Sequence, residues 1–128
     1  MIDHTAVKVS DHTAVKVSDQ ETAKAFYSSA LEPLGYSLAF EAGEFMGFAD
    51  ATGMDLGVVR RDPVGGGHVA FKCSDHSTVD AFHAAAVAAG GTDNGAPGLR
   101  THYHEHYYAA FVQDADGNNI EAVCQAPQ

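Results

Sequence analysis

The chain of 128 residues is long enough to bury one hydrophobic core and too short for two domains of ordinary size. Its formal net charge of −10, with only seven Lys and Arg, disfavours binding to nucleic acid phosphates or to an anionic membrane surface. No apolar run approaches the roughly 20 residues of a membrane span, and the N-terminus does not resemble a signal peptide. Cys73 and Cys124 lie in apolar runs, which is typical of buried, reduced thiols. We therefore expect a single cytoplasmic domain, residues 1–128, whose partner is a small molecule.

The chain begins with an exact duplication, because residues 3–11 are repeated by residues 11–19. His4 and His12 consequently stand at the head of identical strand-like runs. A second, less obvious repeat spans the chain: HTAVKVSDQETAKAFY, from His12, and HVAFKCSDHSTVDAFH, from His68, are identical at eight of sixteen positions. Each window predicts a strand, a Ser-Asp helix start and an Ala-rich helix.

Helix ends and further strands follow in each half. The first helix is predicted to end at 31–35, which contains Pro and Gly, and the second at Gly90-Gly91. Three β-like runs follow the first helix: YSLAFE, EFMGFAD and MDLGVVR. A His/Tyr-rich stretch, YYAAFVQ and NNIEAV follow the second. We therefore predict an α+β fold of two βαβββ modules in one domain, forming a concave mixed sheet with the helices outside.

The expected boundaries are an N-terminal arm at 1–10, module one at 11–62 and module two at 67–127. Between the modules, RDPVGGG is interpreted as a flexible link. His12 lies fifteen residues before Tyr27, as His68 lies fifteen before His83, so the second copy of the duplication keeps the register of the module. The first copy would be an added arm that pairs at a sheet edge or reaches a neighbouring chain. The alternative is that the first copy forms the strand and the second loops out.

Strand alternation brings three polar residues to one face. Val69, Phe71 and Cys73 form an apolar set for the helix side, which leaves His68 on the concave side, and the same alternation places His12 there. In the last strand, Glu121 lies between apolar residues and also faces the concavity. Two imidazoles and a carboxylate can hold one face of a divalent metal and leave positions for substrate oxygens. We predict a metal site at His12, His68 and Glu121; the alternative is that all three are ordinary polar strand residues.

The stretch RTHYHEHYYAAF has three interpretations. On an extended chain His102, His104 and His106 would share a face with Tyr108, and Tyr103 would lie on the other. The stretch could be a pocket wall that supplies a proton-transferring group, an adventitious surface metal site, or a polar loop. Arg100, the first residue of this stretch, would meet a substrate carboxylate or would be a surface charge.

These residues resemble the vicinal oxygen chelate superfamily, which includes glyoxalase I, bleomycin and fosfomycin resistance proteins and extradiol dioxygenases. The resemblance extends from His12 to Cys124 and rests on the His-strand with SDQETAKAFYSSALEPLGY, on GGGHVAFKCSD and on YYAAFVQDADGNNIEAV. It implies the paired βαβββ fold, metal ligands at His12, His68 and Glu121, and a homodimer.

Two positions depart from familiar members. Glyoxalase I-like enzymes carry a glutamate where this chain has Gly57, and fosfomycin resistance enzymes typically carry a threonine where it has Ala14. The familiar extradiol dioxygenases have twice as many modules. The sequence therefore departs from the pattern of each of these three kinds of enzyme.

The leading hypothesis is a metal-dependent lyase, isomerase or dioxygenase acting on a small oxygenated substrate that chelates a divalent metal (Fe, Mn, Ni, Co or Zn). Glu121, His104 and Tyr103 would be its catalytic residues, and Arg100, His106 and Tyr108 would bind substrate. One alternative is a non-catalytic protein that sequesters an antibiotic-like molecule in the groove between the modules. Another is a structural or regulatory dimer with a vestigial site.

Overall fold

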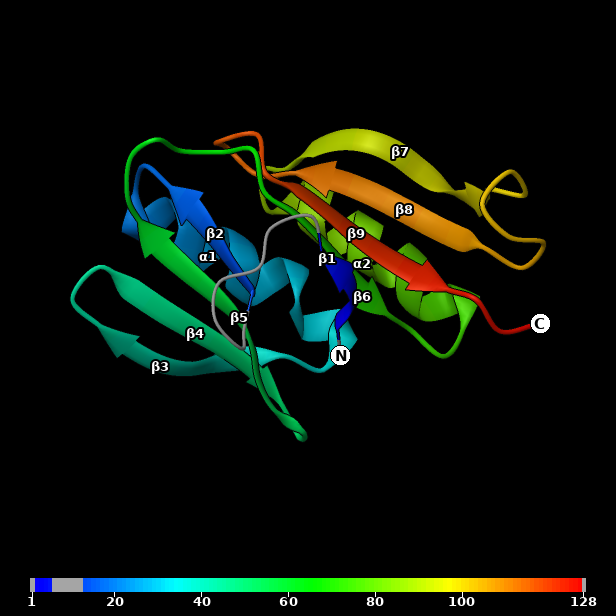
Figure 1. The fold of residues 1–128 in the computed structure, drawn as a ribbon, viewed down its shortest axis with the longest axis horizontal. Helices are drawn as coiled ribbons and strands as arrows, with labels where there is room; N and C mark the ends of the chain where they lie inside the picture. Colours follow the sequence, from blue (N-terminus) through cyan, green and yellow to red (C-terminus); the bar gives the residue numbers. More distant parts are fainter. Residues whose placement is uncertain (1, 6–12, 128) are drawn as a thin grey trace.

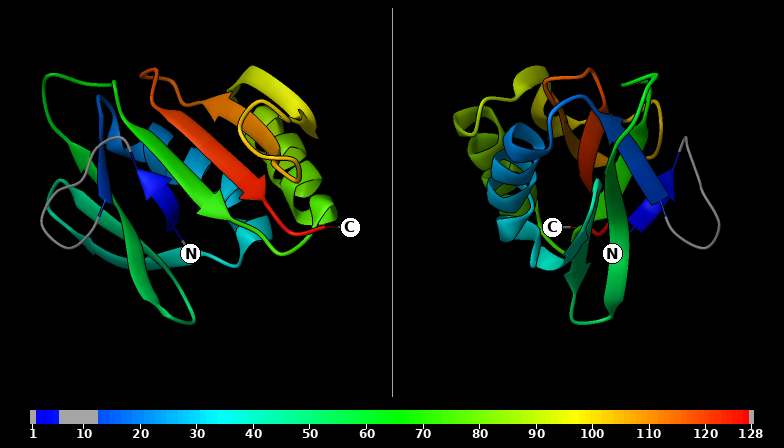
Figure 2. Two further views of the ribbon diagram at one scale, coloured as in Figure 1. Left: turned by 45° about the vertical axis from the view of Figure 1, so that its right-hand side comes forward. Right: turned by 90° about the vertical axis from the view of Figure 1, so that its left-hand side faces the viewer.

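The computed structural model describes residues 2–5 and 13–127 of the chain. They form two sheets that lie side by side, with both long helices on the same side of the sheets (Figure 1; Figure 2, right). In chain order the elements are β1 (Ile2–Thr5), β2 (Thr13–Val17), α1 (Gln20–Ala30), the 3-10 turn η1 (Glu32–Leu34), β3 (Ser37–Ala42), β4 (Phe45–Asp50), β5 (Gly53–Arg60), β6 (His68–Lys72), α2 (His76–Ala88), β7 (Thr92–Leu99), β8 (Tyr108–Gln113) and β9 (Asn119–Cys124).

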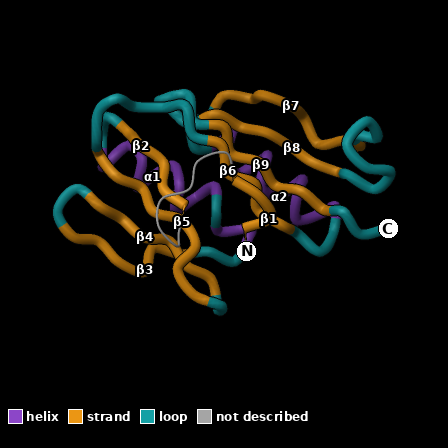
Figure 3. The backbone as a smooth tube through the Cα atoms, in the orientation of Figure 1, coloured by secondary structure: helices purple, strands orange, loops and turns teal. Residues whose placement is uncertain are grey.

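The two sheets repeat one topology. The first has the order β2-β5-β4-β3, and the second has the order β1-β6-β9-β8-β7. In each sheet the strand before the helix pairs in parallel with the last strand of its unit, β2 with β5 and β6 with β9, and the remaining pairs are antiparallel. The predicted α+β fold of two βαβββ modules is therefore confirmed, and Figure 3 shows the helices behind both sheets.

Both helices begin at the aspartates that the sequence indicated. Asp19 accepts a hydrogen bond from the Thr22 backbone N–H at 2.9 Å, and Asp75 accepts one from the Thr78 N–H at 2.8 Å. These bonds satisfy backbone donors that have no partner inside the helix. Hydrogen bonds from Thr22 and Thr78 hold the pKa of each aspartate below its usual range. After α1, Gly35 adopts the left-handed conformation that ends the η1 turn.

One apolar core joins the two units on the helix side of the sheets. Val69 and Phe71 from β6, and Cys73 immediately after it, contribute to this core, as the alternation predicted. Ile120, Ala122 and Cys124 do the same from β9, while Val123 packs on the other face with a smaller cluster. Both cysteines are free thiols and buried, which confirms that interpretation.

The two copies of the duplicated segment form strands in different sheets. The second copy supplies β2, which pairs with β5 from Thr13↔Leu56 to Val17↔Arg60. The first supplies β1, which pairs antiparallel with β6 at the sheet edge, with His4 opposite Ala70. The alternative in which the second copy loops out is therefore wrong. Residues 6–12, and with them His12, lie outside the described residues.

Two parts of the second unit differ from the sequence expectation. Its second strand is β7, Thr92–Leu99, and the His/Tyr-rich stretch at 101–107 forms turns, with Tyr103 N–H donating to Arg100 O and Tyr107 N–H to His104 O. Glycine and proline made 92–99 resemble a loop, but pairing with β8, with register shifts around Gly95 and Gly98, accommodates them. The alternation drawn for an extended 102–108 therefore does not apply.

Candidate metal and substrate site

A buried carboxylate marks the face of the second sheet away from the helices. Glu121 on β9 is 1% exposed, and its Oε1 lies 3.1 Å from Nε2 of His68 at the start of β6. The parallel register of β6 and β9 pairs Ala70 with Glu121, so His68, two residues earlier, shares that face. A carboxylate is costly to bury unless polar partners compensate the loss of water. This pairing confirms the predicted facing of both residues.

Tyr107 is a third member of this cluster. Its hydroxyl donates a hydrogen bond to Oε2 of Glu121, so both carboxylate oxygens have a side-chain partner. Tyr107 is 9% exposed and immediately precedes β8. Tyr107 was not among the predicted site residues, although its alternation with Ala109 and Phe111 places it on this face.

Small and apolar side chains surround the cluster. Ala70, Ala109 and Val123 are fully buried beside Tyr107, and the Phe111 ring lies 6.5 Å from the His68 ring. His68 is the accessible partner, since its side chain is 30% exposed. The site therefore presents one imidazole to the outside, backed by a buried, hydrogen-bonded carboxylate.

Arg100 and Tyr108, both predicted to bind substrate, have structural partners. The Arg100 guanidinium donates to three backbone carbonyls, Gly98 O at 2.6 Å, Ala109 O at 2.9 Å and Ala96 O at 2.9 Å, and lies 5.4 Å from the Phe111 ring centre. It thereby fixes the ends of β7 and β8.

Tyr108 points toward α2 instead of toward Glu121. Its ring stacks on His76 with 3.7 Å between centroids, and its hydroxyl donates to Asp80 Oδ1 at 2.6 Å. That hydrogen bond is the main cause of its raised pKa.

The predicted catalytic residues Tyr103 and His104 lie in the turn above Tyr107. Tyr103 is 62% exposed, and its ring meets the Tyr107 ring edge-on at 5.0 Å. The His104 Nδ1 accepts from the His106 backbone N–H at 3.2 Å, with the two imidazoles 5.9 Å apart. The turn therefore forms a polar rim beside the cluster, and it contacts the cluster where the Tyr103 ring packs on the Tyr107 ring.

Gly57 supplies no side-chain ligand at the fourth position of the family's metal site. Gly57 on β5 pairs with Ala14 on one side and with Gly47 on the other. A Cβ at Gly57 would lie 2.9 Å from Cε1 of Phe45, closer than carbon atoms normally approach. The Phe45 ring thus fills the space in which a glutamate side chain would begin.

The described residues supply part of a metal-binding set. Within residues 2–5 and 13–127, no group of three or more His, Cys, Asp and Glu side chains is arranged to hold a metal ion. The His68 imidazole and the Glu121 carboxylate are nevertheless donors of the kinds that divalent transition metals accept, and they are adjacent. The third predicted ligand, His12, lies outside the described residues. The pair fits a metal site that needs at least one further donor.

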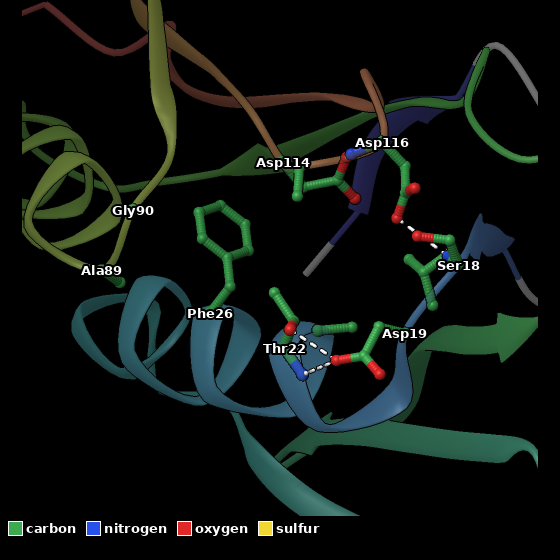
Figure 4. A pocket seen from close by; sticks show the side chains of 11 residues that line it. Ser18, Asp19, Thr22, Phe26, Ala89, Gly90, Asp114 and Asp116 are labelled. Atoms are coloured by element: carbon green, nitrogen blue, oxygen red, sulfur yellow. Dashed lines mark hydrogen bonds between the residues drawn. The ribbon is translucent and has the colours of Figure 1, made fainter.

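A separate cavity of about 230 Å³ lies between the start of α1, the end of α2 and the β8–β9 turn (Figure 4). Phe26 and Ala23 line its apolar side, and Asp19, Asp114 and Asp116 line its polar side. Each carboxylate already accepts hydrogen bonds from a helix end or a turn. This cavity contains none of the predicted site residues.

The paired βαβββ units and the His–Glu pair on the face away from the helices define a protein of the vicinal oxygen chelate class. The chain belongs to the Glyoxalase/Bleomycin resistance protein/Dioxygenase superfamily, whose sequence profile matches residues 9–122. A search of curated proteins finds no significant match. Across the described residues no helix is both long and apolar enough to cross a membrane.

Solved structures agree with this assignment. A glyoxalase/bleomycin resistance protein from Albidiferax ferrireducens is 31% identical, with a TM-score of 0.77 over 91% of this chain and 97% of that one. A glyoxalase/bleomycin resistance protein/dioxygenase family enzyme from Burkholderia phytofirmans is 19% identical, with a TM-score of 0.69 over 88% and 95%. A lactoylglutathione lyase from Agrobacterium tumefaciens is 19% identical, with a TM-score of 0.66 over 91% and 94%. The last two likenesses concern the fold alone.

Proposed function

We propose that this protein is a metal-dependent enzyme, of the lyase, isomerase or dioxygenase type, acting on a small oxygenated substrate. His12, His68 and Glu121 would hold a divalent metal. The observation that carries the proposal is the Glu121 carboxylate, 1% exposed, which meets His68 at 3.1 Å and accepts a hydrogen bond from Tyr107. A buried carboxylate against an imidazole is an arrangement that a cation would stabilise. The proposal includes a homodimer in the cytoplasm.

When bound, the metal would polarise a carbonyl or hydroxyl of a substrate that presents adjacent oxygens. The protein's own residues would orient the reaction. Tyr107 fixes the Glu121 carboxylate through Oε2 and leaves Oε1 turned toward His68. Ala70 and Ala109 are fully buried beside Tyr107 and help to keep water away from the Glu121 carboxylate.

The rim would supply proton transfer and substrate contacts. Tyr103 packs on Tyr107, and His104 is in the same turn, so a proton donor or acceptor from either would lie near the mouth of the site. His106 would contact substrate from this turn. Arg100 and Tyr108 would influence substrate binding by fixing the strands that carry the turn, since their polar groups bond to backbone and to Asp80.

One observation favours the sequestering alternative. Phe40, on edge strand β3, is 52% exposed, and its ring lies 6.0 Å from that of Phe45. Phe40 pairs with Gly47 and Ala42 pairs with Phe45, so this aromatic pair lies across β3 and β4. An exposed aromatic ring packed on a half-buried one, beside glycines, suits the binding of a flat, apolar ligand without chemistry.

Metal analysis of untagged protein tests the proposal. We expect about one equivalent of a divalent metal per chain in the wild type and loss of it in His68→Ala and Glu121→Ala, since each removes a donor. Arg100→Ala is the control, because its guanidinium bonds to carbonyls and supplies no ligand. Wild-type protein without metal, or variants that keep it, would refute the metal site. Stabilisation by aromatic ligands that is the same with and without chelator would favour sequestration.

A further inference from the structure

Asn118, in the turn before β9, uses every polar group of its side chain on backbone or carboxylate partners. Its Nδ2 donates to Lys16 O at 3.0 Å and to Asp114 Oδ2 at 2.8 Å, and its Oδ1 accepts from Gly67 N–H at 3.0 Å. The residue is fully buried. Only an amide supplies two donors and one acceptor in this arrangement, so a carboxylate of the same shape could not replace it.

These contacts connect three strands from the two units. Lys16 is near the end of β2, the strand that follows position 12, and Gly67 immediately precedes His68 on β6. Asn118 itself immediately precedes β9, which carries Glu121. A second bond, from Asn119 N–H to Gly67 O at 2.8 Å, completes the attachment of β6 to β9. One buried side chain thus connects the backbones of β2 and β6 with the turn that begins β9.

The inter-module link is packed against this side chain. A Cβ on Gly67 would lie 2.8 Å from Asn118 Oδ1, and one on Gly65 would clash with the carbonyl oxygen of Asp116. Gly65 N–H also donates to Lys16 O at 3.1 Å, the carbonyl that Asn118 uses. Gly65 and Gly67 therefore let the backbone of the link pack closely against Asn118 and Asp116. The link is packed in place, whereas the sequence suggested that it was flexible.

We propose that Asn118 is a positioning residue for the metal site: by tying β2 to β6 and β9, it sets the separation and angle of the two strands that carry His68 and Glu121. This inference rests on the proposed function. Its physical basis is that ligands on different strands form a site only if the strands are held at a fixed distance, and partners behind the ligands commonly control metal affinity. Asn118 contacts no candidate ligand side chain in any hydrogen bond described above, so it acts through the backbone.

Mn²⁺ binding to the full chain, measured by calorimetry, tests this role. We expect Asn118→Ala to weaken Mn²⁺ binding by about 10-fold or more, the size of effect typical of residues that support a metal ligand. Asn118→Asp should weaken it too, because it loses both donors to Lys16 and Asp114. Tyr27→Phe is the matched control: it removes a hydrogen bond to Asp114 in the same buried cluster and leaves the contacts to Lys16 and Gly67 intact. Its Mn²⁺ affinity should equal that of the wild type, although the fold is destabilised.

NMR of the metal-free protein is the second measurement. In Asn118→Ala the Gly67 amide and the His68 ring resonances should shift, whereas Tyr27→Phe should leave them in place. If Asn118→Ala and Tyr27→Phe weaken Mn²⁺ binding equally, the effect is loss of stability alone and the positioning role is wrong. Wild-type protein that binds no Mn²⁺ and carries no metal on purification would refute the proposed function. The His68 resonances would still decide whether Asn118 positions this strand, and unshifted resonances would refute the inference.

Discussion

Replacing Tyr27 by Phe tests the energetic role of the polar cluster between the units. The Tyr27 hydroxyl is buried and donates to Asp114 Oδ2 at 2.6 Å, and Asp114 is only 7% exposed. A hydrogen bond to a charged group contributes about 1.5–3 kcal/mol net. Asp114 keeps three other donors, the backbone N–H groups of Asp116 and Asn118 and the Asn118 amide. We therefore expect the lower part of the range, a loss of about 1.5–2 kcal/mol in the free energy of unfolding.

Urea unfolding followed by circular dichroism measures this loss as a lower midpoint at an unchanged slope. Tyr103→Phe is the control, because that tyrosine is 62% exposed, and a change below about 0.5 kcal/mol is expected there. Desolvation, followed by the Asp114 charge, raises the pKa of Tyr27 well above its usual value. The neutral phenol therefore stabilises the folded state below about pH 10, and this contribution is lost as the pH rises further. A Tyr27→Phe variant as stable as the wild type at pH 7 would refute the reasoning.

Three further predictions follow from single positions. Gly57→Glu should destabilise the fold, because the new Cβ at position 57 would collide with the Phe45 ring. Adding Phe45→Ala to this variant should restore the thermal midpoint. If it does not, the Phe45 ring is not what prevents a glutamate at position 57. Burial raises the pKa of Cys73 to about 12, so Ellman's reagent should leave this thiol unmodified in native protein and modify it in urea; rapid native reaction would contradict its burial. Asp75→Ala should lower the thermal midpoint at pH 7 and reduce the loss of stability in acid. The lowered pKa of this capping carboxylate stabilises the fold above about pH 4, and that stabilisation disappears as the pH falls through the folded-state pKa. Thermal melts of both proteins from about pH 2 to 7 would show this difference, and parallel curves would contradict it.

The sequence by itself determined the features that depend on local pattern. The two Ser-Asp pairs determined where α1 and α2 begin, since a capping aspartate accepts a hydrogen bond from the backbone N–H three residues later. Period-two alternation assigned Phe71 and Cys73 to the core and His68 and Glu121 to the opposite face. The 56-residue repeat then predicted two equivalent units, and the register of Tyr27 predicted that the second copy of the duplication forms β2.

Tertiary structure decided the features that depend on residues distant in the chain. Pairing with β8 makes a strand of Thr92–Leu99, whose glycines and proline indicate a loop when read alone. The turn at 101–107 packs the Tyr103 ring against the Tyr107 ring, and backbone carbonyls occupy the Arg100 guanidinium. Periodicity cannot predict such contacts, because alternation specifies a face only where the chain is extended, and a turn sends each side chain in its own direction. The candidate ligands were therefore readable from pattern, whereas the groups that hold them in place emerged only when the strands were packed together.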